Sequence, residues 1–142
     1  MTRPATLTEV ALRRNDGEDF GPLVAEFLDT FYAALPDSAS AEACFADAPA
    51  PIADANQHAL LGAVAEHLAR RWGLAIPAWS NDPSRFLSRP HFTTDLDGFK
   101  ALMLAQSPLA FRRRLIFTEA EPLRRARMPR APAVALLPSR RW

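Results

Sequence analysis

The chain has 142 residues, of which 49% are hydrophobic and 23% are charged, and its net charge is +1. This length suits one domain with its own hydrophobic core, and the single cysteine, Cys44, excludes an intrachain disulfide framework. Because no stretch approaches the ~18 apolar residues of a membrane-spanning helix and the first residues are mixed polar, we expect a cytoplasmic protein without membrane contact.

The near-neutral total conceals two halves of opposite charge. Residues 1–69 contain eleven Asp and Glu against three Arg, whereas residues 70–142 contain fourteen Lys and Arg against five acidic residues. This division predicts one of three electrostatic contacts: between the halves of one chain, between two copies, or between the basic half and a phosphate-rich or acidic partner.

The first elements in chain order are a short helix and a long one. Thr6 and Glu9 have the spacing of a capping box, which predicts a helix over residues 6–14. In residues 18–35, apolar side chains recur every three or four positions, which is typical of an amphipathic helix, and Pro36 ends it.

A loop and a second long helix are predicted next. Residues 36–54 are rich in Pro, Ala, Ser and Asp and indicate a loop, with at most one helical turn near residues 42–45. The helix over residues 55–72 has Asp54 as its N-cap and Gly73 as its C-terminal signal.

The chain after these helices is predicted to form short elements. Prolines that follow Asp82 and Arg89 favour turns. A third main helix is expected to begin at Asp95 or Asp97 and to end at Gln106.

The last predicted elements are two short helices around a strand. The Ser-Pro pair at 107–108 is a good start for a helix over residues 109–114, and a second capping-box spacing precedes a helix over residues 122–128. Residues 115–117 suit a short strand. The resulting expectation is an all-α, single small domain over residues 1–128, followed by a Pro- and Arg-rich tail over 129–142.

No recognised pattern for catalysis, a cofactor or a metal occurs in the sequence. His58 and His67 share a helix, but a separation of nine residues rotates them by about 900°, so they point to opposite faces and cannot share an ion. The five glycines form no phosphate-binding loop. We therefore expect no metal, no cofactor and no enzymatic activity. The alternative enzyme site would be built around Asp82, Arg85 and His91 in the turn-rich segment.

The basic half supplies the main candidates for contact with a partner or with phosphate. These are Arg112, Arg113, Arg114, Arg124, Arg125 and Arg127. Consecutive residues on a helix fan out over about 200°, so the Arg triplet cannot present a single face. Part of it should therefore bind helix carbonyls or acidic residues of the first half. A protein-facing surface, a nucleic-acid surface and a merely solvated face remain as alternatives.

Bulky aromatic residues in the second half are predicted to be core anchors, because each can bury about 150–250 Å². They are Trp72, Trp79, Phe86, Phe92, Phe99, Phe111 and Phe117.

Several motifs between residues 58 and 126 resemble one family. They include Glu-His-Leu-Ala-Arg-Arg at 66–71, Pro-His-Phe at 90–92, and Ser-Pro-Leu-Ala-Phe-Arg-Arg-Arg-Leu-Ile-Phe at 107–117. This block resembles an uncharacterised bacterial domain that is often found behind an N-terminal helix-turn-helix in antitoxin-like or regulatory proteins beside nucleotidyltransferase-type toxins. Residues 1–54 show no helix-turn-helix pattern, because they are acidic and interrupted by proline, so direct operator binding is not expected.

The resemblance implies a protein-interaction module: an antitoxin-like or regulatory partner in a bacterial two-gene system, with the family-like block at residues 55–128 and an acidic half at 1–54. The expected partner is the product of the neighbouring gene, or a second copy in a homodimer. The alternative function is nucleic-acid binding by the Arg-rich half.

Overall fold

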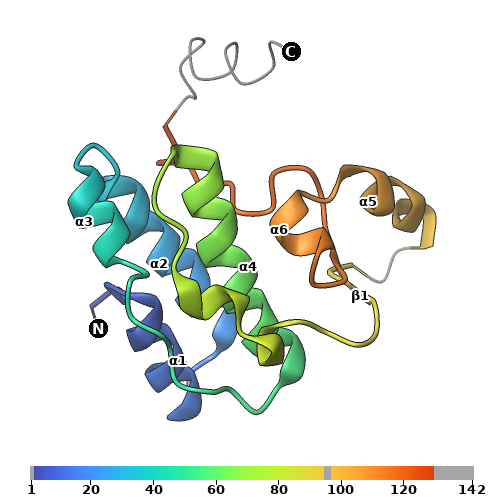
Figure 1. Ribbon diagram of the computed structural model, residues 1–142, viewed down its shortest axis with the longest axis horizontal. Coiled ribbons are helices and arrows are strands. Elements are labelled where there is room, and N and C mark those ends of the chain that lie inside the picture. The colour runs from blue at the N-terminus through green and yellow to red at the C-terminus, as the bar shows by residue number, and fades with distance from the viewer. Residues whose placement is uncertain (1, 95–96, 130–142) are drawn as a thin grey trace.

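The protein is mostly α-helical (Figure 1). The computed structural model describes residues 2–94 and 97–129. The α-helices are α1 (Leu7–Asn15), α2 (Phe20–Ala34), α3 (Ser38–Ala43), α4 (Ala55–Trp72), α5 (Lys100–Gln106) and α6 (Leu109–Arg112). Three short 3-10 helices are η1 (Ala78–Asn81), η2 (Pro83–Arg85) and η3 (Asp97–Phe99), and two strands are β1 (His91–Phe92) and β2 (Ile116–Phe117). The predicted mostly α-helical fold class is confirmed.

The local signals at the first helix act largely as predicted. The side chain of Thr6 accepts a hydrogen bond of 3.1 Å from the backbone N–H of Glu9 and so caps α1. The Glu9 carboxylate does not close the capping box on Thr6, since it accepts from the N–H of Ala5 instead.

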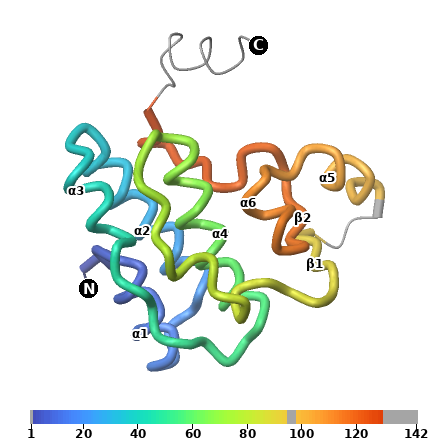
Figure 2. The backbone as a smooth tube through the Cα atoms, viewed as in Figure 1, coloured from blue at the N-terminus to red at the C-terminus, as the bar shows by residue number. Residues whose placement is uncertain are grey.

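Helix α4 has the bounds predicted from the sequence and lies at the centre of the fold. Asp54 accepts from the N–H groups of Asn56 and Gln57, and Gly73 ends the helix in the left-handed conformation, at φ 70°. Figure 2 shows the same backbone as a tube, with α1, α2 and α3 to one side of α4 and the short elements of residues 91–117 to the other. Ten of the eighteen residues of α4 are buried, and these include the polar residues His58 and Glu66.

One hydrophobic core connects the helices. It is formed by apolar side chains of α1, α2 and α4 together with Ala110 and Phe111 of α6, Ile116 of β2, and Leu123. The aromatic rings of Phe31 and Phe45 pack 6.0 Å apart within it. No helix in the described residues has both the length and the apolar character needed to cross a membrane.

The small sheet joins two segments that are distant in the sequence. Strands β1 and β2 are parallel, with His91 opposite Ile116 and Phe92 opposite Phe117. The strand predicted at 115–117 is thus present from Ile116 onward, whereas its partner strand was not predicted. Leu115, directly before it, has a left-handed backbone at φ 62°.

Three predicted helices need correction. Residues 122–128 form turns, because Leu123 is buried and the Tyr32 hydroxyl donates to its carbonyl at 2.8 Å, which holds the segment against the core. Helix α3 begins at Ser38 and so precedes the single turn expected near 42–45. Helix α6 ends at Arg112, two residues early, as the chain turns toward β2.

The predicted start signals after α4 also differ in detail. Asp97 opens η3, which leads into α5, whereas Asp95 lies outside the described residues. Ser107 does not cap α6. Its hydroxyl donates to the carbonyl of Met103 and accepts from the N–H of Thr118 at 2.8 Å, so it joins α5 to the end of β2. The predicted tail lies outside the described residues from 130 onward.

The predicted aromatic anchors are confirmed for Phe111 and Phe117, which are buried. The prediction is wrong for Phe99, whose side chain is 50% exposed, because η3 holds it at the outer edge of the fold.

Candidate interaction surface

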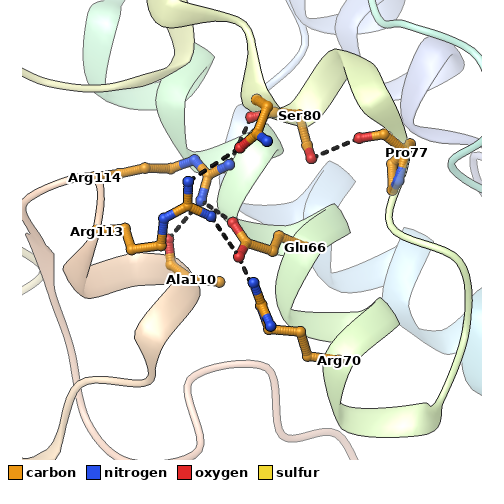
Figure 3. Close-up of polar contacts among 8 residues, drawn as sticks. Glu66, Arg70, Pro77, Ser80, Ala110, Arg113 and Arg114 are labelled. Carbon is orange, nitrogen blue, oxygen red and sulfur yellow. Dashed lines mark hydrogen bonds and ion pairs between the residues drawn. The ribbon is translucent and has the colours of Figure 1, made fainter.

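The Arg triplet folds largely inward, onto a single buried carboxylate. Glu66 on α4 is 1% exposed and accepts hydrogen bonds from three arginines, each at 2.7 Å (Figure 3). Arg114 donates to Oε1, while Arg70 and Arg113 both donate to Oε2. Glu66 is thus the counter-charge that connects α4 to the chain after α6.

The charge state of Glu66 follows from these contacts. Burial alone would raise the pKa of the Glu66 carboxyl, but hydrogen bonds from Arg114, Arg70 and Arg113 lower that pKa to about 2. The group is therefore ionised throughout the neutral range, as a carboxylate with several charge-assisted hydrogen bonds should be.

Arg114 is a structural residue. Its side chain is 0% exposed, and besides Glu66 it donates to the carbonyls of Ala110 at 2.7 Å and Ser80 at 2.6 Å. Its guanidinium also lies over the ring of Phe86, 4.5 Å from the centroid. These partners account for its place in the interior, and they leave none of its surface for an external ligand.

Arg113 completes the same cluster from a more open position. It donates to Asn81 at 3.1 Å as well as to Glu66, and its side chain is 33% exposed. Because the carboxylate carries one charge and the three arginines carry three, the cluster has an excess of positive charge on its outer side.

A second contact between the halves involves Arg125. Its guanidinium donates to both carboxylate oxygens of Asp29 on α2, at 3.0 and 2.8 Å, and this hydrogen bonding lowers the pKa of Asp29. Asp29 is largely buried, and Arg125 supplies its counter-charge. The expectation that acidic residues of the first half bind part of the Arg triplet is confirmed for Glu66, whereas Asp29 binds Arg125, which lies outside the triplet.

The remaining arginine candidates are exposed. Arg112 donates to the carbonyl of Ser107 at 2.7 Å, while the side chains of Arg124 and Arg127 have no hydrogen bond or ion pair with any described residue. Of the six candidates, only Arg112, Arg124 and Arg127 are therefore exposed without a carboxylate partner.

The three turn-segment candidates do not form one site. Arg85 is buried, where it donates to the carbonyls of His58 at 3.0 Å and Pro49 at 2.9 Å. Asp82 caps η2 through the N–H of Ser84. His91 lies in β1, and none of the hydrogen bonds found in the described part of the chain joins its ring to Asp82 or Arg85.

A polar chain that the sequence did not reveal runs from α4 to η2. The N–H of Ile52 donates to Nδ1 of His58, so Nε2 carries the proton and donates to the Ser84 hydroxyl at 3.0 Å. That hydroxyl in turn donates to Asp82 at 2.7 Å. Because Nε2 of His58 already carries a proton, it cannot take the proton of the Ser84 hydroxyl. The arrangement is therefore structural and does not activate a nucleophile.

The exposed apolar residues gather around α5. Four of the six large apolar side chains that are exposed in the described residues lie here: Phe99, Leu102, Leu104 and Leu109, each about half exposed. We call these four the α5 surface. Phe99 and Leu102 line one hollow beside α5, whereas Leu104, two residues after Leu102, points to another side of the helix. Within α5 only Met103 is buried, so this helix, which is apolar on nearly all sides, covers little of the core. The sequence indicates this, because all five residues from 101 to 105 are apolar.

No group of three or more His, Cys, Asp or Glu side chains with metal-binding geometry occurs among residues 2–94 and 97–129. Comparisons with protein-family models, with curated proteins and with solved structures found no match to this chain.

Proposed function

We propose that this protein is a non-enzymatic protein-interaction module that uses the α5 surface to bind a partner protein. The observation that carries the proposal is the concentration of exposed Phe and Leu side chains at residues 99–109. Clustered apolar side chains on an otherwise polar surface are typical of protein-binding sites, whereas apolar residues that are exposed singly are ordinary.

The partner should combine an apolar patch with acidic residues at its edge. Arg112 follows the α5 surface in the sequence, and its exposed side chain has no carboxylate partner among the described residues. Opposite charges at the rim of an interface favour encounter and correct orientation, while the apolar centre supplies most of the affinity.

This role fits a bacterial two-gene system in the cytoplasm. The partner would be the product of the neighbouring gene, and this chain would be the antitoxin-like or regulatory component. The resemblance of residues 58–126 to a domain of such systems supports this setting. The non-enzymatic character is supported by the Asp82, Ser84 and His58 chain, in which the proton order disfavours nucleophilic catalysis.

Nucleic-acid binding by the Arg-rich half is the alternative, and the inward contacts of the arginines weigh against it. Arg113, Arg114 and Arg125 are held by Glu66 and Asp29. Of the six arginine candidates, Arg112, Arg124 and Arg127 then remain to contact phosphates, so the six together should bind nucleic acid more weakly than a fully exposed set.

The test is co-expression with the product of the adjacent gene, followed by co-purification of the two proteins. Leu102→Glu should abolish the complex, because it places a charge within the α5 surface. Leu12→Glu is the matched control, since Leu12 is 54% exposed and Leu102 is 48% exposed, but Leu12 lies on α1.

Equal loss of the complex in the two variants, or no complex with the unchanged chain, would contradict the proposal. Tight binding of DNA or RNA at about 50 mM salt that weakens steeply as salt rises, and that Arg112→Ala and Arg124→Ala each reduce, would favour the alternative instead.

A further inference from the structure

A cavity of about 400 Å³ lies between α2, α4, α6 and residues 118–125. Most of its wall is apolar, with Val24 and Leu28 from α2, Leu60 from α4, Phe111 from α6, and Leu123. Small-molecule sites typically measure about 300–1,000 Å³ and are lined mainly by hydrophobic and aromatic side chains. The cavity therefore has the size and the lining of a ligand site.

The hydroxyl groups in the wall offer no free donor to a polar ligand. Thr118 donates its hydroxyl to the carbonyl of Glu119 at 2.8 Å, and Thr93 donates to the carbonyl of Phe117 at 3.4 Å. A ligand with many hydroxyl or amide groups would find no free hydroxyl donor on this wall, so burying those groups against it would be unfavourable. The interior thus favours a hydrocarbon chain.

Positive charge gathers at one end of the cavity. Arg124 and Arg125 both line it, and the contact of Arg125 with Asp29 places this end beside Leu28 of α2. Asp29 neutralises Arg125, but Arg124 has no carboxylate partner among the described residues.

The wider surroundings of this end are also basic. The charges of Arg3 and Arg127 act on Asp29, and that of Glu26 acts on Arg125. Four arginines therefore face two carboxylates near the mouth. The other acidic residue of the wall, Glu119, lies at the opposite edge, where it also borders a neighbouring cavity beside α5.

We propose that this cavity binds an amphipathic carboxylate, with its alkyl chain against the apolar wall and its carboxylate beside Arg124. The site lies outside the α5 surface and is an activity additional to partner binding. The chemistry identifies a medium-chain fatty acid or a ligand with the same head group and chain.

The first experiment compares three probes with one chain length by isothermal titration calorimetry on the full chain. Octanoate should bind, octan-1-ol should bind about tenfold more weakly, and octylammonium should bind more weakly still, because only the carboxylate is complementary to Arg124. From hexanoate to decanoate, each two-carbon step should raise the affinity by about tenfold until the cavity is filled. Equal binding of the three octyl probes, or no binding of decanoate, would overturn the proposal.

A plug variant tests the location of the chain. Gly21 lines the cavity, and a Cβ there would meet no atom within 4 Å. Gly21→Leu should fill the cavity and reduce octanoate binding at least tenfold, while Gly21→Ala should reduce it little. Both variants should fold, since each improves the helix propensity of α2. Unchanged binding by a folded Gly21→Leu variant would contradict the assigned site.

A charge variant tests the position of the head group. Arg124→Gln should weaken octanoate about tenfold and leave octan-1-ol unchanged. Arg89→Gln is the matched control, because Arg89 is exposed and does not line the cavity. Equal effects of the two substitutions on octanoate would remove Arg124 from the site. Leu102→Glu on the α5 surface tests only the partner complex, whereas the Gly21 and Arg124 variants test only ligand binding. Loss of one activity therefore does not decide the other.

Discussion

Arg114 donates a hydrogen bond of 2.7 Å to Glu66 although the two side chains are 0% and 1% exposed. Both charges lie inside the protein, where loss of one partner leaves the other buried without compensation. Glu66 belongs to the acidic half of the chain and Arg114 to the basic half. The packing of residues 110–118 on α4 therefore depends on the carboxylate of Glu66.

Replacement of Glu66 should destabilise the fold strongly. Glu66→Gln removes the charge that compensates Arg114 and is expected to lower the free energy of unfolding by about 3–5 kcal/mol in urea denaturation. Arg70→Ala is the control, because the Arg70 side chain is 45% exposed and its ion pair should contribute less than about 1 kcal/mol. Similar losses from the two substitutions would contradict the structural role of Glu66.

Acid should destabilise the protein in a defined window. The pKa of Glu66 is lowered from 4.5 to about 2, so its stabilising contribution is complete above pH 4.5 and is lost as pH falls toward 2. The full loss corresponds to about 3 kcal/mol at most. Asp29, whose pKa is also lowered, adds to the same trend. Unfolding free energy measured from pH 6 to 2 should fall steeply, and less steeply in Glu66→Gln; equal slopes would contradict this assignment.

A buried histidine should add a separate dependence at higher pH. Burial, and then the charge of Arg85, lower the pKa of His58 below 6.5, so the unfolded chain takes up a proton before the folded chain does. Stability is therefore complete above pH 6.5 and should decrease below it by up to about 1.4 kcal/mol per pH unit. In His58→Asn, the amide oxygen can still accept from Ile52 but does not titrate. This variant should flatten the slope between pH 6.5 and 5, as measured by urea denaturation.

A side chain at Gly62 should be unfavourable, because α4 approaches two buried arginines there. A Cβ at this position would lie 3.1 Å from Nε of Arg114 and 3.2 Å from Cβ of Arg85. Gly62→Ala should lower the free energy of unfolding by about 1–3 kcal/mol through overpacking. The control is Gly21→Ala, which meets open space and should stabilise by up to about 1 kcal/mol through helix propensity. A stabilising Gly62→Ala would show that the neighbouring side chains move aside.

Local signals in the sequence predict the elements that depend on local contacts. Helix α4 follows from an apolar stripe between Asp54 and Gly73, and both caps act within a few residues. Residues 122–128 carry an equally good capping signal, yet they form turns. Their conformation depends on Tyr32 and Asp29, which lie more than 90 residues earlier in the chain. Periodicity within the segment contains no information about such contacts.

The same distinction applies to the candidate site. The inward course of the Arg triplet was predictable, since consecutive helical residues cannot share one face. Its target was not, because Glu66 lies 48 residues before Arg114 and looks like an ordinary i,i+4 partner of Arg70. The exposed position of Phe99 was missed for the opposite reason: aromatic residues are usually buried, and only the packing of η3 and α5 leaves this one outside.

The opposite charges of the two halves can be satisfied either between two copies of the protein or within one chain. Asp29 and Glu66 already bind Arg125, Arg113 and Arg114 internally, so these charged groups are not available to hold a homodimer. We expect that the isolated protein, without a partner, forms a dimer through the α5 surface, since exposed apolar clusters associate.

Salt should distinguish this dimer from one held by charge. Ion pairs at a surface contribute only about 0–1 kcal/mol each and are screened, so a charge-held dimer should dissociate between low and roughly molar salt. A dimer through the α5 surface should persist at both extremes, because apolar burial is not weakened by salt. In light scattering, Leu102→Glu should give a monomer and Leu12→Glu should not. A mass near 15.7 kDa for the unchanged chain at both salt extremes and at high protein concentration would contradict the homodimer.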